Sequence, residues 1–208
     1  MRRLFIPLVA PALAALVLAA EARAAGGNYR FDGGTPAEQR QVRAALDASS
    51  FNWSLVPVQI TIHIARDIPS SQAAPGQIWL DAGLLDSGEF SWAFVQHEYG
   101  HQVDFFLLDD AKRTTLQQAL GGEEWYYGEP LPHSAYGCER FASTLAWAYW
   151  QSPDNALEPR SASDESGGMP PAQFRALLTR LLRAPTTSAV PVGQVANAPK
   201  RVRRTSPH

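Results

Sequence analysis

Alternation of apolar and polar residues predicts a half-buried strand in the first third of the chain. Between residues 58 and 64, every second position is Val or Ile, and Gln59, Thr61 and His63 lie between them. Successive strand side chains point to opposite faces, so one face is expected to be buried and the other polar. His63 is therefore expected to be an exposed strand residue. A second, short strand is expected at Gln77 to Asp81, after a loop rich in Pro, Ser, Ala and Gly.

Three further segments have the apolar spacing of helices. Thr35-Pro36-Ala37-Glu38 is a capping box with proline at the first helical position, and it predicts a helix that runs to about Ser49. A second helix is expected to begin near Asp86. One face of this second helix carries Phe90, Phe94, His97, His101 and Phe105. The third helical segment is Tyr136 to Trp150, and the combination of strands and helices predicts an α+β fold.

Composition indicates one globular domain, which we place at residues 25–184. The chain has 208 residues, of which 45% are hydrophobic and 18% are charged, so it can bury a sizeable core. The predicted domain has eleven basic and nineteen acidic residues, which argues against nucleic-acid binding. A single cysteine, Cys138, excludes an intramolecular disulfide, and we expect it to be a small buried apolar residue.

The first 24 residues have the pattern of a signal peptide. Arg2 and Arg3 precede an apolar run from Leu4 to Ala20, and small residues at positions 22 and 24 fit a cleavage site after Ala24. The expected location is therefore secreted or extracytoplasmic, with no transmembrane span in the mature chain. The alternative is an uncleaved N-terminal anchor, because the run is near the shortest length that can span a bilayer.

The last 24 residues, 185–208, are expected to be a disordered basic tail. They contain four prolines and have no periodic apolar face. Their positive charges could hold the protein weakly to an anionic cell envelope, or the tail could simply be solvated. The basic residues near its end are Lys200, Arg201, Arg203 and Arg204.

The most informative motif is His-Glu-x-x-His at residues 97–101. With about 3.6 residues per helical turn, His97 and His101 lie one turn apart on one face, where both imidazoles can bind one zinc ion. Glu98 then lies beside the open coordination position, where a general base is needed. The alternative is that both are core histidines satisfied by hydrogen bonds.

A catalytic zinc ion usually has three protein ligands, so a third residue is required. The metzincin pattern is excluded, because it needs a glycine at the position of Asp104 and a ligand at the position of Leu107. Glu139 is the favoured third ligand, because it lies on a helical segment whose face also carries the small residues Ala142 and Ala146. Those small side chains would allow the two helices to approach closely.

Other carboxylates downstream remain alternatives for the third ligand. Glu123, Glu124 and Glu129 lie in a segment rich in Gly and Pro, where a solvated or substrate-facing role is more natural. Glu139 itself could instead pair with Arg140 or with the helix dipole.

The two motifs resemble the zinc-binding helices of gluzincin metallopeptidases. The similarity covers about sixty residues, from Trp92 to Trp150, and is greatest to the lethal-factor-like group that includes Pro-Pro endopeptidase. It implies a zincin-like fold with a small, mostly antiparallel sheet, whose edge strand packs on the first helix. Ile78-Trp79-Leu80 is our candidate for that edge, which in zincins binds extended substrate by backbone pairing. Members of the group carry a tyrosine seven residues before the third ligand, where this chain has Pro132.

These features predict an exported zinc endopeptidase with one Zn²⁺ ion and a peptide or protein as substrate. Glu98 would be the general base, and Tyr136 is the first candidate for the hydrogen-bond donor to the oxyanion. His133, Tyr126 and Tyr127 remain open for the donor role. The alternative function is a non-catalytic zinc-binding interaction domain on the cell envelope.

Two further roles are left open by the sequence. Asp104 could accept a hydrogen bond from a metal-bound imidazole, or it could be an exposed helix residue. The aromatic residues Trp125, Tyr126 and Tyr127 lie beside glycines, and they could form a mobile wall of the cleft or a cluster that packs the loop down.

Overall fold

The computed structural model describes residues 26–128 and 130–184 and confirms the α+β class. The predicted signal peptide, the predicted tail and Glu129 lie outside the described residues. The strands are β1 (Tyr29–Gly33), β2 (Ile60–Ala65), β3 (Gln72–Ala74) and β4 (Gln77–Asp81). The α-helices are α1 (Pro36–Ala48), α2 (Ala82–Leu85), α3 (Trp92–Leu107), α4 (Asp110–Leu120), α5 (Gly137–Tyr149) and α6 (Pro171–Arg183). Short 3-10 turns are η1 (Trp53–Leu55), η2 (Gly88–Ser91), η3 (His133–Ala135) and η4 (Glu165–Gly168).

The sheet is mixed, and its strand order is β1-β2-β4-β3. β2 pairs in parallel with both β1 and β4, and only β3 and β4 are antiparallel, so the prediction of a mostly antiparallel sheet is wrong. The predicted edge, Ile78–Leu80, is also wrong, because β4 lies between β2 and β3. The segment expected to be a loop forms the edge strand β3 instead. It turns back through Pro75 and Gly76, whose φ of 79° suits the third position of a tight turn.

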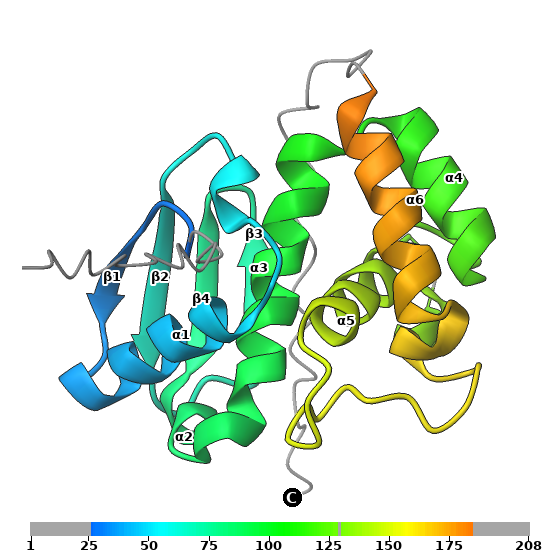
Figure 1. Ribbon diagram of the computed structural model, residues 1–208. Helices are drawn as coiled ribbons and strands as arrows, with labels where there is room; N and C mark the ends of the chain where they lie inside the picture. The colour runs from blue at the N-terminus through cyan, green and yellow to red at the C-terminus, as the bar shows by residue number, and fades with distance from the viewer. Residues whose placement is uncertain (1–25, 129, 185–208) are drawn as a thin grey trace, which may run out of the picture.

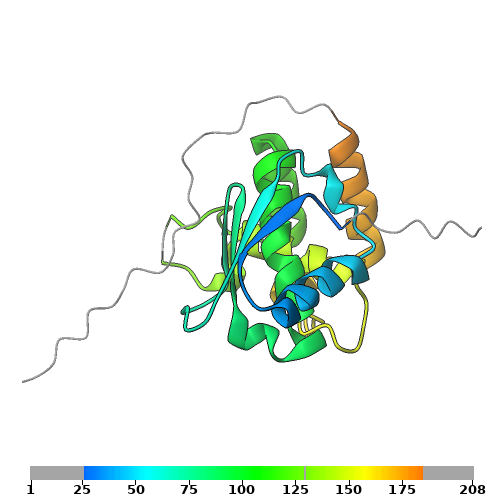
Figure 2. The same ribbon diagram turned by 90° about the vertical axis from the view of Figure 1, so that its left-hand side faces the viewer.

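Helices α1 and α3 cover the buried face of the sheet (Figures 1 and 2). The predicted alternation in β2 is confirmed, since Ile60, Ile62 and Ile64 are buried while His63 on the opposite face is partly exposed. His63 stacks on Trp79 there, well outside the metal-binding motif. On the far side of α3 from the sheet lie α4, α5 and α6, so α3 is central (Figure 1).

Local sequence signals explain most helix boundaries. The capping box at Thr35 is present, with the Thr35 N–H donating to Glu38 Oε2 at 2.7 Å, and α1 ends at Ala48 as expected. α3 begins at Trp92, later than the predicted start near Asp86, because the glycine at position 88 has a φ of 67° and the chain forms a 3-10 turn first. None of the helices among residues 26–128 and 130–184 has the length and apolar character needed to cross a bilayer.

The close approach of α3 to α5 depends on two small residues. A Cβ atom added at Gly100 would lie 3.2 Å from Ala142 Cα and 3.3 Å from Ala142 Cβ. Both distances are shorter than an ordinary carbon–carbon contact of about 3.5–4.0 Å. Gly100 and Ala142 therefore set the separation at which Glu139, one turn before Ala142, faces the histidines of α3.

We expect Gly100→Leu to weaken both the fold and zinc binding. The added side chain must push α5 away from α3, and overpacking of this kind costs about 1–3 kcal/mol of unfolding free energy. Urea denaturation and zinc titration measure the two effects. Gly83→Leu is the matched control, because Gly83 is exposed and a Cβ there has only ordinary contacts. Unchanged stability and zinc affinity in Gly100→Leu would contradict the packing argument.

Candidate metal centre

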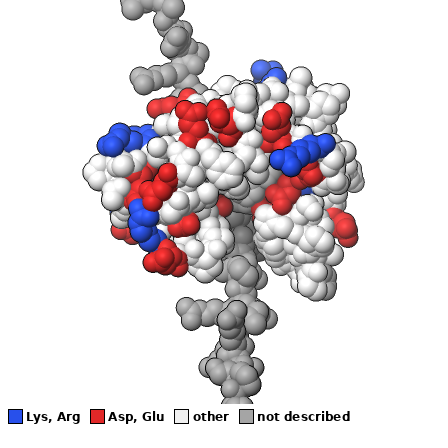
Figure 3. Space-filling view, turned by 90° about the horizontal axis from the view of Figure 1, so that it is seen from below, with Lys and Arg blue, Asp and Glu red and all other residues white. Residues whose placement is uncertain are grey.

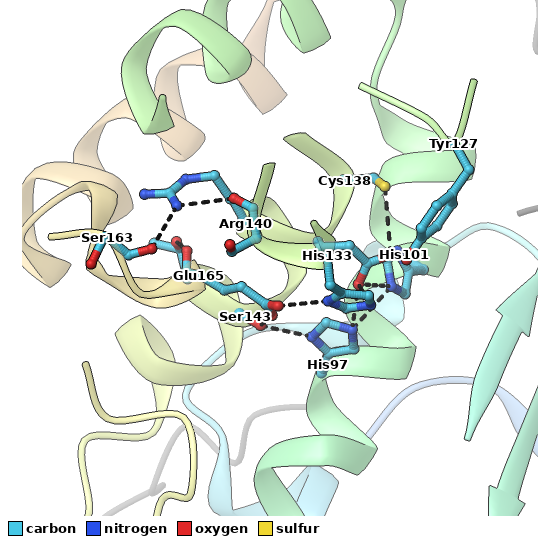
Figure 4. Close-up of polar contacts among 12 residues, drawn as sticks. His97, His101, Tyr127, His133, Cys138, Arg140, Ser143, Ser163 and Glu165 are labelled. Atoms are coloured by element: carbon cyan, nitrogen blue, oxygen red, sulfur yellow. Dashed lines mark hydrogen bonds and ion pairs between the residues drawn. The ribbon is translucent and has the colours of Figure 1, made fainter. Parts of the chain in front are cut away.

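Three buried side chains from α3 and α5 converge on one point. The Nε2 atoms of His97 and His101 are 3.1 Å apart, and Glu139 Oε2 lies 3.0 Å from the first and 3.4 Å from the second. All three residues are buried, with at most 8% of their surface exposed. The structure thus brings together the three residues that the sequence predicts as metal ligands, and Figure 4 shows the two histidines side by side.

This geometry fits a divalent cation. Ligands about 2.0–2.2 Å from a tetrahedral zinc ion lie roughly 3.3–3.6 Å from one another, close to the separations observed here. Glu139 Oε2 is buried and receives no hydrogen bond of good geometry from the described residues. A buried carboxylate oxygen that has only poorly aligned imidazole nitrogens beside it is costly, whereas a cation at the common point would satisfy it and both nitrogens. His97, His101 and Glu139 therefore form a group that could hold a metal ion.

Glu139 is held as a carboxylate. Burial alone would raise the pKa of Glu139, but His101 and His97 lower it much more. The pKa of Glu139 therefore lies well below its usual range, and the group is ionised. Its other oxygen, Oε1, accepts a hydrogen bond of 2.8 Å from the hydroxyl of Tyr127. Cys138 is buried as predicted, and its thiol lies 3.6 Å from the same oxygen.

His97 is supported by Ser143 and Glu165, which the sequence analysis did not identify. His97 Nδ1 lies 3.0 Å from Ser143 Oγ, and Ser143 Oγ donates to Glu165 Oε2 at 2.9 Å. Asp104 does not serve as an acceptor for an imidazole. It is fully buried and accepts hydrogen bonds from Arg113 and from the indole of Trp125.

Glu98 lines the same cavity as the three candidate ligands. Burial raises the pKa of Glu98 to about 7, with His97 opposing this effect and Glu139 adding to it. A cation at the site would favour the ionised form of Glu98. The residue is thus placed where it can exchange a proton with a molecule bound beside the metal.

The candidate hydrogen-bond donors occupy different places. Tyr136 is buried, its hydroxyl accepts from the Leu131 N–H, and its ring packs on Tyr127 outside the cavity lining. Tyr127 and His133 line the cavity, whereas Tyr126 packs beside Arg113. The structure therefore brings Tyr127 and His133 to the site, and it does not bring Tyr136 there.

His133 is a further histidine beside the three candidate ligands. Its Nε2 lies 3.3 Å from Glu139 Oε2, and its Nδ1 lies 2.6 Å from Glu165 Oε1. The hydrogen bond to Glu165 raises the pKa of His133, although burial partly opposes the shift. His133 is half exposed, with 55% of its side-chain surface accessible, unlike the buried His97 and His101.

Arg140 fixes the two loops that carry His133 and Glu165. Its guanidinium donates to the carbonyl of Ser163 (Figure 4) and also to the carbonyls of Ser134, Ala162 and Leu120. Arg140 thus binds backbone oxygens. It does not pair with Glu139, so the alternative prediction of a Glu139–Arg140 ion pair is wrong. Glu123 and Glu124 do not line the cavity.

The cavity that contains these residues has a volume of about 1770 Å³. This exceeds the roughly 300–1,000 Å³ of a typical small-molecule pocket, so the cavity has room for an extended molecule. Acidic side chains are prominent on the face seen from below (Figure 3). Beyond the metal group of His97, His101 and Glu139, and beyond Glu98 and Glu165, the charged residues of the cavity wall are Asp81, Asp154, Glu158, Arg160 and Asp164. Their excess of negative charge favours entry of cations.

Comparison with known proteins gives no match: no protein family, no curated protein and no solved structure is significantly similar to this chain. The functional argument therefore depends on the residues and geometry of the site itself.

Proposed function

We propose that the protein is a zinc-dependent endopeptidase of gluzincin type. The main support is the convergence of His97 Nε2, His101 Nε2 and Glu139 Oε2 within 3.0–3.4 Å of one another, with Glu98 on the same cavity wall. A set of two imidazoles and one carboxylate is the donor set of several zinc peptidases, and it leaves one coordination position open.

The chain supplies the groups that peptide hydrolysis requires. When bound, a zinc ion supplies Lewis acidity, which polarises a carbonyl group and makes a water molecule more acidic. Glu98 would accept the proton of the attacking water and deliver it to the leaving amine. The imidazole of His133 and the hydroxyl of Tyr127 face the metal group. His133 could donate a hydrogen bond to the carbonyl oxygen as it gains charge, and Tyr127 could do so by exchanging its bond to Glu139 for one to that oxygen.

The edge strand β3 is the natural partner for an extended substrate. β3 pairs with β4 on one side only, and Gln72 and Ala73 line the cavity. An edge strand offers free backbone N–H and C=O groups, which can bind a peptide by strand addition. The exposed Phe90 and its neighbour Phe94 also line the cavity and offer an apolar surface to substrate side chains.

Metal analysis combined with a peptide-library cleavage assay tests this function. Purified wild-type protein should contain one zinc ion per chain and cleave internal peptide bonds, and activity should disappear with a chelator and return with Zn²⁺. His101→Ala and Glu139→Gln should lose both the metal and the activity. Glu123→Gln is the matched control, because Glu123 is exposed and outside the cavity. Full zinc affinity in Glu139→Gln would show that Glu139 is not a ligand.

A second candidate function is a non-catalytic zinc site, and the position of His133 favours it. Its Nε2 atom lies 3.3 Å from Glu139 Oε2, so a small loop movement could place a fourth protein ligand on the metal. Structural zinc sites are usually closed by four such ligands. If His133→Ala lowers zinc affinity as strongly as His101→Ala and no peptide is cleaved, the non-catalytic function is correct.

A further inference from the structure

Glu165 and Ser143 form a hydrogen-bonded path that ends on the candidate metal ligand His97. Glu165 begins the 3-10 turn η4, and its Oε2 accepts the hydrogen bond of 2.9 Å from Ser143 on α5. Ser143 is completely buried, and its oxygen lies 3.0 Å from His97 Nδ1. These contacts lie on the side of the imidazole opposite to the metal group (Figure 4).

The direction of each hydrogen bond follows from the chemistry of Glu165. An ionised carboxylate can only accept, so the Ser143 hydroxyl must donate its single hydrogen to Glu165. The serine oxygen can then only accept from His97, which requires a hydrogen on Nδ1. A neutral imidazole with its hydrogen on Nδ1 has the free electron pair on Nε2, and Nε2 is the atom that faces His101 and Glu139.

We propose that Glu165, acting through Ser143, is a positioning residue that selects the metal-binding tautomer of His97 and fixes its ring. The inference uses the metal site of the proposed function, but it does not require peptide hydrolysis. Partners of this kind around metal-bound histidines typically change metal affinity by about 10–100-fold when they are removed. The other oxygen of Glu165 binds His133, so one carboxylate holds His133 directly and His97 through Ser143.

Nitrogen-15 NMR of the histidine side chains in the zinc-free protein tests the tautomer directly. Wild type is expected to show a hydrogen on His97 Nδ1, whether or not Nε2, which faces the Glu139 carboxylate, also carries one. In Glu165→Ala the Ser143 hydroxyl is free to donate to Nδ1, so the population should shift towards the tautomer with hydrogen on Nε2. Glu158→Ala is the matched control, because it removes an exposed carboxylate from the same cavity wall. It should leave the His97 tautomer unchanged.

Zinc affinity, measured by competition with a chelating dye, is the second readout. We expect Glu165→Ala and Ser143→Ala each to lower the zinc affinity about 10-fold. Because both residues act on one path, the double variant should bind zinc as tightly as the single variant with the lower affinity. Ser143→Ala removes only one buried oxygen, so it tests the path even if Glu165→Ala alters the turn. An unchanged His97 tautomer in Glu165→Ala, or an affinity change below 2-fold in Ser143→Ala, overturns the proposal. If wild type binds no zinc, the proposed function fails, while the tautomer measurement still decides this inference.

Discussion

Glu98→Gln should abolish peptide cleavage while zinc remains bound. Glutamine has nearly the shape of glutamate, but its amide cannot accept a proton from water or pass one to the leaving amine. General acid–base catalysis typically contributes about 10²–10⁴-fold to the rate, so kcat/KM should fall by roughly that factor. Glu98 lines the cavity without belonging to the three-residue metal group, so zinc affinity should change little.

The measurement combines kcat/KM on a cleaved library peptide with zinc content and the melting temperature of the zinc-bound protein. Glu89→Gln is the matched control, because it makes the same chemical change at an exposed position outside the cavity. Wild-type rates in Glu98→Gln would remove the general base from the mechanism. A parallel loss of zinc and activity would instead indicate that Glu98 binds the metal.

Local patterns were enough to predict the two helices that carry the metal group. The spacing of His97 and His101 depends only on helical geometry, and the surrounding apolar residues indicate that this helix is buried. The sequence favours Glu139 over Glu123, Glu124 and Glu129, because Glu139 lies on an apolar helix with small neighbours. The structure explains that choice, because Gly100 and Ala142 allow α3 and α5 to approach closely.

The strand pairing was not predicted, because it depends on residues far apart in the sequence. The register of β2 against β1 joins residues that are 31 positions apart, such as Tyr29 and Ile60. The alternating pattern identifies a buried face, but it does not give the partner or the direction of a strand. Expectations taken from the family resemblance filled that gap, and they were wrong for both the strand directions and the edge.

The sequence does not identify Glu165 and Ser143 as neighbours of the metal group, and it leaves His133 and Tyr127 only as two of several candidate donors. Glu165 and Ser143 are 22 positions apart and meet because the loop after α5 folds back over that helix. His133 and Tyr127 lie in a segment rich in Gly and Pro, where no periodicity shows which side chains point inward. Arg140 determines part of this path by binding backbone carbonyls of two loops, a role that its place in the sequence does not reveal.

Zinc should strongly stabilise the wild-type protein. It should have almost no effect on the stability of the His101→Ala variant. A ligand that binds only the folded state adds about 4 kcal/mol when its free concentration is 1,000 times Kd. For a domain of this size, 1 kcal/mol raises the melting temperature by about 2–4 °C, so a rise of about 8–16 °C is expected. The gain arises because the cation satisfies the buried oxygen of Glu139 and two imidazole nitrogens that otherwise face one another.

Differential scanning calorimetry with and without zinc measures this effect, and each variant is compared with its own zinc-free form. His63→Ala is the matched control, because His63 lies on the outer face of the sheet, where it binds Asp32 and Gln77. Its removal can lower the melting temperature, but the response to zinc should equal that of wild type. If zinc raises the melting temperature of His101→Ala as much as that of wild type, zinc binds elsewhere. The convergence of the three side chains would then need another explanation, such as a network of hydrogen bonds in the core.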